Sequence, residues 1–288
     1  MFFAVYSFLY KDVKLKDIVD YLKIKKVYMF NLANLFTAFN LIAGISSILF
    51  AILGYLDFAV FAIFAGAIFD FLDGFIARAM KTMGELGKQL DSLADMITFG
   101  VAPGILMMVI LSIDIETYTH FSVEGIRTNF FQWIDAFMNG EFNFLPLFAL
   151  LIPFFSLFRL AKFNLDTRQT SSFIGFPTPA NTLFYTTFPL VLVFKAEDIT
   201  FYTYFFHPIT LCGLIVVLSL MMVSEIPLFS LKVKSFKLKG NEIRFTFLLI
   251  SLIFILVFNV WAIALIVLLY LILSIVENTF FNTDSNEI

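Results

Sequence analysis

The 288-residue sequence contains few of the residue types on which soluble enzymes and metal proteins commonly rely. A single cysteine, Cys212, excludes a disulfide within the chain and a metal site made of clustered cysteines. Only two histidines, His120 and His207, are available as general bases. Charged residues make up 14% of the chain, against about 25% in soluble domains. The net charge of −3 is too small to indicate a nucleic acid as partner.

Apolar residues dominate instead. They make up 60% of the chain, and its mean hydropathy is +0.93. A bilayer core about 30 Å thick requires roughly 20 apolar residues for each spanning helix. The sequence therefore predicts an all-α polytopic membrane protein. Its eight predicted crossings lie near residues 34–55, 58–80, 92–113, 144–163, 177–195, 205–225, 244–259 and 261–280.

The basic residues predict the orientation of this bundle. With the N-terminus in the cytoplasm, only Arg127 and Lys195 of the 19 lysines and arginines fall on the outer side. Cytoplasmic loops of membrane proteins are enriched in lysine and arginine, so we expect both termini to be cytoplasmic. The acidic connection over 114–143 then lies outside and has room for a short surface helix.

The chain divides into four predicted segments. Residues 1–30 form an amphipathic segment suited to the membrane surface, since apolar side chains recur there at helical spacing. Residues 31–228 form the main membrane domain. A basic cytoplasmic loop over 229–243 follows, and residues 244–288 form a transmembrane hairpin with a short tail.

Four aspartates, Asp70, Asp73, Asp91 and Asp95, stand in or beside the second and third apolar runs. An acidic side chain deep in a spanning helix costs about 2.5–3.5 kcal/mol on insertion scales. Pairing with Arg78 alone would leave three carboxylates uncompensated, although positions near the cytoplasmic ends reduce the cost. We therefore expect these carboxylates to have a function.

Helical spacing gathers these aspartates with small residues on two faces. At about 100° per residue, one face carries Asp70, Asp73, Gly74 and Ala77, and the next helix carries Gly84, Gly87, Asp91 and Asp95. The short turn between the helices makes them antiparallel neighbours, so the two faces can meet. Oxygen ligands suit Mg²⁺ or Mn²⁺, and two such ions would match four carboxylates. The small residues either leave room for a bulky ligand or allow close helix packing.

A two-metal site at this depth fits displacement at phosphorus, because the metals stabilise the attacking and leaving oxygens. Arg78 would then pair with phosphate oxygens. His120 and His207 are predicted on the far side, which makes Asp95 the candidate base. An ion-coupled transporter, in which the carboxylates bind the transported ion, is the alternative from another class.

The aspartates and their small neighbours form one continuous pattern, Asp70-x-x-Asp73-Gly74-x-x-Ala77-Arg78, eight residues, and then Gly87-x-x-x-Asp91-x-x-x-Asp95. This pattern resembles the signature of the CDP-alcohol phosphatidyltransferases. The resemblance implies a six-helix membrane core behind an interfacial helix, with two added C-terminal helices and a homodimeric assembly. It also implies that divalent metals assist the replacement of CMP in a CDP-linked lipid by an alcohol.

The resemblance assigns roles to individual residues. Asp70, Asp73 and Asp91 would be metal ligands, and Asp95 would be a metal ligand and the proton acceptor. The expected contacts to CDP-diacylglycerol are Asn34, Thr37, Gly74, Ala77, Arg78 and Gly87. Position 84 is glycine where the family pattern has a hydroxyl residue on the diphosphate, so Thr82 or a backbone amide would take that contact.

Further segments resemble the membrane-integral phosphatidylserine synthase branch of this family. They include residues 34–44, 158–164 (FRLAKFN) and 173–180 (FIGFPTPA). We therefore expect transfer of the phosphatidyl group from CDP-diacylglycerol to L-serine. Sister reactions with glycerol 3-phosphate, inositol phosphate or choline as acceptor stay open.

Acceptor contacts are expected from Arg159, Asn164 and Thr178, each with a structural alternative. Arg159 sits beside a helix end, where it would otherwise anchor the helix at the membrane surface. Asn164 and Thr178 would otherwise cap helix ends. Capping of the first membrane helix is likewise the alternative for Asn34 and Thr37.

Overall fold

A computed structural model describes residues 31–113, 122–166, 172–194, 206–229 and 241–280. The predicted interfacial segment 1–30 and residues 230–240 of the predicted basic loop lie outside these described residues. Within the described ranges the chain is helical apart from its turns and one short two-stranded ribbon.

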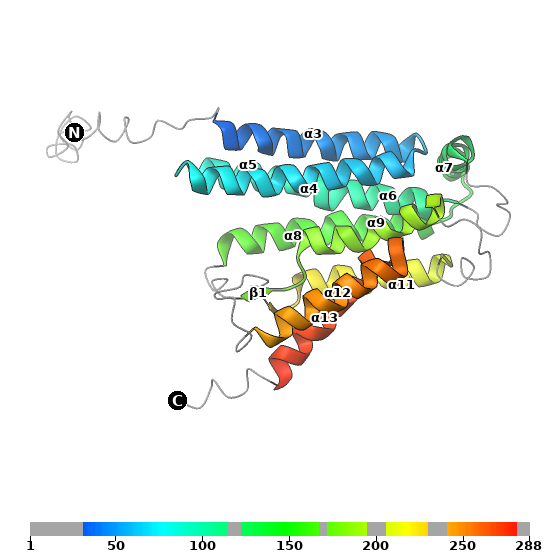
Figure 1. Ribbon diagram of the computed structural model, residues 1–288. Helices are drawn as coiled ribbons and strands as arrows, with labels where there is room; N and C mark the ends of the chain where they lie inside the picture. The colour runs from blue at the N-terminus through cyan, green and yellow to red at the C-terminus, as the bar shows by residue number, and fades with distance from the viewer. Residues whose placement is uncertain (1–30, 114–121, 167–171, 195–205, 230–240, 281–288) are drawn as a thin grey trace, which may run out of the picture.

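The helices form a bundle in which most axes run side by side (Figure 1). Its first half consists of α3 (Leu32–Ile52), α4 (Leu56–Ala79), α5 (Glu85–Asp95), the π-helix η1 (Met96–Val101), α6 (Ala102–Leu111) and α7 (Val123–Met138). Its second half consists of the 3-10 helix η2 (Leu145–Leu150), α8 (Leu151–Leu165), α9 (Thr178–Phe194), α11 (Pro208–Val223), α12 (Glu242–Phe258), the 3-10 turn η3 (Asn259–Trp261) and α13 (Ala262–Phe280).

The predicted all-α membrane architecture is confirmed. Five stretches of the described residues are long and apolar enough to cross a membrane: Leu32–Ile52, Leu56–Ala79, Glu85–Leu111, Leu145–Leu165 and Glu242–Asn278. The last of these stretches contains both α12 and α13. Among the described residues, α11 is a shorter apolar helix of 16 residues, and α9 has 17 residues. The chain is therefore a polytopic membrane protein, and the number of eight crossings stays a prediction.

Two local features were not predicted. Strands β1 (Ser172–Ile174) and β2 (Pro227–Phe229) pair antiparallel, with Phe173 opposite Leu228. The third apolar helix starts at Glu85, earlier than the predicted 92, and passes through the π-helical η1 directly after Asp95. π-Helical segments occur often at functional sites.

The connection over residues 114–143 contains the predicted short helix, α7. Helix α7 begins after Ser122, whose side chain accepts a hydrogen bond from the Gly125 amide at 3.1 Å. Its buried side chains, Ile126 and Phe130, lie one turn apart. Figure 1 shows α7 lying across one end of the bundle.

The opposite end of the bundle collects the segments that carry the predicted site. The start of α3, the end of α4, the start of α5 and the end of α8 lie at that end (Figure 1). Asn31 caps α3, because its side chain accepts a hydrogen bond from the Asn34 amide at 2.7 Å. Capping by the side chains of Asn34 and Thr37 is therefore wrong.

Helix α3 packs against both α4 and α5, which run antiparallel as predicted but make few direct contacts with each other. The two helices are joined by a short turn in which Lys81 has a φ of 53°. This arrangement leaves space between α4 and α5 at their connected ends. That space contains the predicted site.

Close packing on the other side of α3 depends on glycine. A Cβ atom at Gly44 would lie 2.5 Å from Thr98 Oγ1 and 2.9 Å from Thr98 Cα, and one at Gly66 would lie 2.6 Å from Thr98 Cγ2. Thr98 Oγ1 also donates a hydrogen bond to the Asn40 carbonyl at 2.9 Å. Thr98 thereby fixes η1 against α3 and α4.

Replacing Gly44 by alanine should destabilise the protein by about 1–3 kcal/mol, because the added methyl group meets the backbone of η1. Gly213→Ala is the matched control, since a Cβ atom there meets nothing within 4 Å. Thermal unfolding in detergent measures both. Equal unfolding temperatures for the two variants would contradict this account of the packing.

Candidate active site

Three of the predicted aspartates converge. One carboxylate oxygen each from Asp70, Asp91 and Asp95 lies within 4.8 Å of the other two. Asp70 comes from α4, whereas Asp91 and Asp95 are one turn apart on α5. Asp91 Oδ1 is buried and accepts no hydrogen bond from the described residues. Ionised carboxylates at this separation repel one another, so a bound cation would stabilise the arrangement.

Helix α3 supplies hydrogen bonds to two carboxylates. Thr37 Oγ1 donates to Asp73 Oδ2 at 2.6 Å, and Asn40 Nδ2 donates to Asp95 Oδ1 at 3.1 Å. Thr37 and Asn40 are themselves buried. Asn40 was not among the predicted site residues, although its spacing of three from Thr37 places both on one face of α3.

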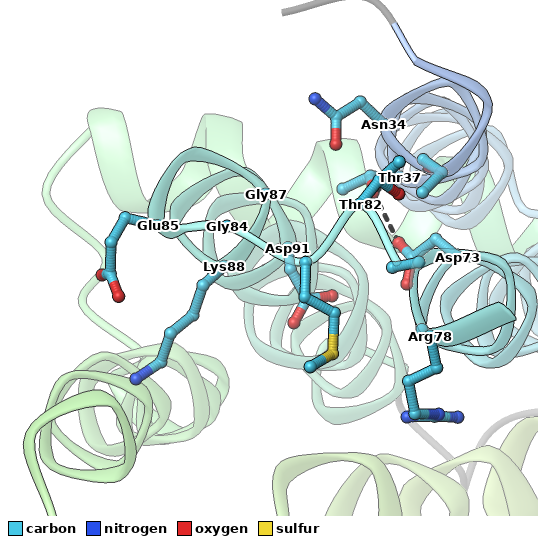
Figure 2. Close-up of a pocket in the computed structure, with 14 residues that line it drawn as sticks. Asn34, Thr37, Asp73, Arg78, Thr82, Gly84, Glu85, Gly87, Lys88 and Asp91 are labelled. Carbon is cyan, nitrogen blue, oxygen red and sulfur yellow. Dashed lines mark hydrogen bonds between the residues drawn. The ribbon is translucent and has the colours of Figure 1, made fainter. Parts of the chain in front are cut away.

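Asp73 lies outside the group formed by the other three aspartates. Its carboxylate is bonded to Thr37, and the side chain is only 5% exposed. Figure 2 shows Asp73 on α4 and Asp91 on α5 beside the same cavity. Its predicted role as a metal ligand stays a prediction.

A cavity of about 420 Å³ opens beside the aspartates. Its lining includes every predicted contact to the CDP-linked lipid: Asn34, Thr37, Gly74, Ala77, Arg78 and Gly87. Asp73 and Asp91 also line it, together with residues of the α4–α5 turn such as Thr82 and Gly84. The structure thus gathers these residues around one space (Figure 2).

The glycines of this cavity leave room for a ligand. A Cβ atom at Gly87 would meet only Asn34 Oδ1, at 3.5 Å, and one at Gly74 would meet only the Arg78 guanidinium, at 3.5 Å or more. At Gly84 it would meet nothing within 4 Å. These positions differ from Gly44, where the helices touch. Close helix packing is therefore the wrong explanation for Gly74 and Gly87.

Arg159 of α8 is buried and lies near the acidic cluster. It is 8% exposed, and α8 packs against η1, the π-helix that directly follows Asp95. Nη1 is 3.5 Å from Thr178 Oγ1, and the guanidinium carbon lies 5.0 Å from the centre of the Phe163 ring. This burial contradicts the alternative that Arg159 is an anchor at the membrane surface.

Asn164 connects α8 to α5. Its Nδ2 donates to Ser92 Oγ at 2.7 Å, and its carbonyl accepts a hydrogen bond from Lys88 Nζ at 2.8 Å. Figure 2 shows the Lys88 side chain extending toward α8. The Asn164 side chain therefore binds a neighbouring helix, and capping of its own helix is not its role. Thr178 is fully buried at the first turn of α9.

The acidic cluster fits a divalent metal site. Oxygen ligands suit Mg²⁺ and Mn²⁺, and the carboxylates of Asp70, Asp91 and Asp95 are close enough to bind one ion together. The buried Asp91 oxygen without a hydrogen-bond donor is the atom that such an ion would satisfy. The donor set alone does not distinguish Mg²⁺ from Mn²⁺.

Comparison with known proteins decides the family. The model of the CDP-alcohol phosphatidyltransferase family matches residues 30–276. The chain belongs to this family.

Related proteins carry serine synthase names. A CDP-diacylglycerol–serine O-phosphatidyltransferase of Helicobacter pylori (strain J99) is 30% identical over 259 residues, which cover 88% of this chain and 92% of the relative. One of Bacillus subtilis is 31% identical over 114 residues, covering 40% of this chain and 50% of the relative. An archaetidylserine synthase of Methanothermobacter thermautotrophicus is 28% identical over 205 residues, covering 70% and 71%.

As a CDP-alcohol phosphatidyltransferase, the protein is an enzyme of phospholipid synthesis. This membership decides against the ion-coupled transporter. The converging aspartates agree with the metal site of the family.

Mn²⁺ should stabilise the protein by about 2.7 kcal/mol at a hundredfold excess over its Kd. Asp91→Asn should lose most of this gain, and without metal it should be no less stable than the wild type because a repulsion is removed. Thermal unfolding with and without Mn²⁺ measures both effects. Glu85→Gln, on the same helix and cavity, is the control. If Asp91→Asn and Glu85→Gln lost the same part of the stabilisation by Mn²⁺, the assignment of Asp91 to the metal site would be contradicted.

Proposed function

We propose that the enzyme transfers the phosphatidyl group of CDP-diacylglycerol to L-serine, giving phosphatidylserine and CMP. The observation that carries this proposal is a buried arginine, Arg159, on α8, the helix that packs against η1 directly after Asp95. An acceptor that carries one carboxylate and one hydroxyl matches this pair, because the guanidinium binds the carboxylate while Asp95 receives the hydroxyl proton. The names of the relatives support the same acceptor.

The nucleotide part of the donor is placed in the cavity between α4 and α5. Its volume and polar lining suit a CDP group, with Asn34 and Thr37 on one helix and Gly74, Ala77 and Gly87 giving space. Arg78 lines the cavity, and neither of the two ion pairs within the described residues involves it. Its guanidinium is therefore available for the phosphates.

A second cavity is placed to hold the diacylglycerol part. It has a volume of about 700 Å³, lies between α3 and α5, and shares Asn34 and Thr37 with the first. Most of its lining is aliphatic, including Leu41, Leu90 and Leu93. A donor lipid that occupies both cavities would place its diphosphate beside the aspartates.

Asp70, Asp73, Asp91 and Asp95 would hold two Mg²⁺ or Mn²⁺ ions. Bound there, the ions supply positive charge to the diphosphate and to the leaving CMP. Asp73 is held by Thr37 and Asp95 by Asn40, so α3 fixes the orientation of both carboxylates.

Asp95 is the proposed general base. It accepts the proton of the serine hydroxyl, and the serine oxygen attacks the phosphorus that is bonded to diacylglycerol. The bond from this phosphorus to the oxygen of CMP breaks, and CMP leaves with the electron pair. Direct attack needs no covalent enzyme intermediate, in agreement with the absence of a Ser/His pair from the site residues.

Charge near Arg159 favours serine over a phosphorylated alcohol. Lys162, one turn further along α8, forms an ion pair with Glu225, and Lys88 is bonded to the Asn164 carbonyl. A phosphate carries more charge than a carboxylate and would call for further cations beside Arg159. Both lysines are already engaged.

The site is proposed to face the cytoplasm, because the basic residues predict that side for both termini. The start of α3, the first described helix, lies at the same end of the bundle as the turn between α4 and α5, which supports this orientation (Figure 1). The homodimer that the family resemblance implies belongs to the same proposal.

Purified enzyme supplied with labelled CDP-diacylglycerol and Mn²⁺ should release CMP with L-serine and not with glycerol 3-phosphate, inositol phosphate or choline. CMP release and the labelled lipid product are measured for each alcohol separately. Release with glycerol 3-phosphate in place of serine would refute the proposed acceptor.

Asp95→Asn should lower turnover at least about 100-fold, because a general base typically contributes 10²–10⁴-fold. The amide retains a partner for Asn40, so the unfolding temperature should not fall. CMP release under saturating serine measures the loss. Asp57→Asn, at the other end of α4, is the control and should keep full turnover. Turnover by Asp95→Asn at the wild-type rate would exclude Asp95 as the base.

A further inference from the structure

Helix α8 touches the segment formed by α5 and η1 at two places, one on each side of Arg159. At the first place, Asn164 Nδ2 donates a hydrogen bond to Ser92 Oγ at 2.7 Å. At the second, a Cβ atom on Gly100 would lie 3.1 Å from Ser156 Cβ, so α8 and η1 are in direct contact there. Because the end of α8 meets α5 and an earlier part of α8 meets η1, the two segments run antiparallel.

The two contacts fix the register between these segments. They are eight residues apart on each segment, which is roughly 12 Å along a helix. Asp95 comes three residues after Ser92 on the same face of α5, and Arg159 comes three residues after Ser156 on the same face of α8. The register therefore places Asp95 and Arg159 between the two contacts, on the faces that the segments turn toward each other.

A lysine reinforces the contact at the end of α8. Lys88 Nζ donates a hydrogen bond to the Asn164 carbonyl at 2.8 Å, and Figure 2 shows its side chain extending toward α8. This carbonyl belongs to the last turn of α8, where the helix dipole favours a cation. Helix α5 thus holds both the side chain and the backbone of Asn164.

The distance between Arg159 and Asp95 depends on both contacts. At Gly100 the segments are held together by van der Waals packing, which leaves α8 able to tilt about this point. The hydrogen bond between Asn164 and Ser92 opposes a tilt away from α5. Since Arg159 lies between the two contacts, loss of this bond would move its guanidinium away from Asp95.

We propose that Asn164 is a positioning residue for the acceptor: by binding Ser92, it holds α8 at the distance from α5 at which Arg159 and Asp95 reach the same acceptor molecule. Asn164 then acts through α8, in place of the direct acceptor contact that the sequence predicts. This inference rests on the proposed function, in which Arg159 binds the carboxylate of L-serine and Asp95 receives its hydroxyl proton.

Asn164→Ala should raise the KM for serine about three- to tenfold, because the hydrogen bond that holds α8 against α5 is lost. The KM for CDP-diacylglycerol and kcat should stay within about twofold, since saturating serine draws the two groups together again. Steady-state kinetics with each substrate varied in turn measures these constants. Glu225→Gln is the control, because it breaks the ion pair with Lys162, another side-chain contact at the end of α8.

A double-mutant cycle tests whether Asn164 acts through Ser92. Ser92→Ala should raise the KM for serine by a similar factor, and the double variant should show no further rise, because both changes remove the same bond. Stabilisation by Mn²⁺ should be that of the wild type in all three variants, since the carboxylates are unchanged. A smaller stabilisation in Asn164→Ala would mean that this residue acts through the metal site, and would overturn the inference.

Two further outcomes would overturn the inference and leave the proposed function standing. One is additive effects of Asn164→Ala and Ser92→Ala, and the other is a KM for serine in Asn164→Ala equal to that in Glu225→Gln. Arg159→Lys tests the proposed function itself and should raise the KM for serine. An unchanged KM for serine in Arg159→Lys would overturn both.

Discussion

Repulsion among carboxylates that meet in a membrane protein is the constraint around which this structure is organised. Asp70, Asp91 and Asp95 place oxygens within 4.8 Å of one another at the junction of two helices. In a bundle of low dielectric constant this convergence is costly unless cations compensate it. The converging carboxylates therefore form a binding site for cations. A diphosphate with bound metal ions is a ligand that suits this site.

Helix α3 supports that convergence with two of its faces. One face packs against η1, and the other donates hydrogen bonds to the carboxylates. Toward η1 it presents Gly44, so that Thr98 packs directly against its backbone. Toward the site it presents Thr37 and Asn40, which donate hydrogen bonds to Asp73 and Asp95. Because α3 touches α4 and α5 while these two make few contacts with each other, the space between them remains open for the donor.

The sequence predicted much of this arrangement because the relevant signals are local. Apolar runs gave the membrane helices, and spacings of three and four residues placed the aspartates and Gly87 on the faces that line the site. Features set by tertiary contacts had no such signal. The π-helical η1 depends on the fit of Thr98 between two helices, and Asn40 is recognisable only once α3 lies beside Asp95.

The central claim is that the aspartates of α4 and α5 bind divalent cations together. Anomalous scattering from crystals of the enzyme grown with Mn²⁺ tests it most directly. The account predicts manganese peaks coordinated by carboxylate oxygens of Asp70, Asp91 and Asp95. Peaks elsewhere, or none at saturating Mn²⁺ with these carboxylates turned apart, would contradict it.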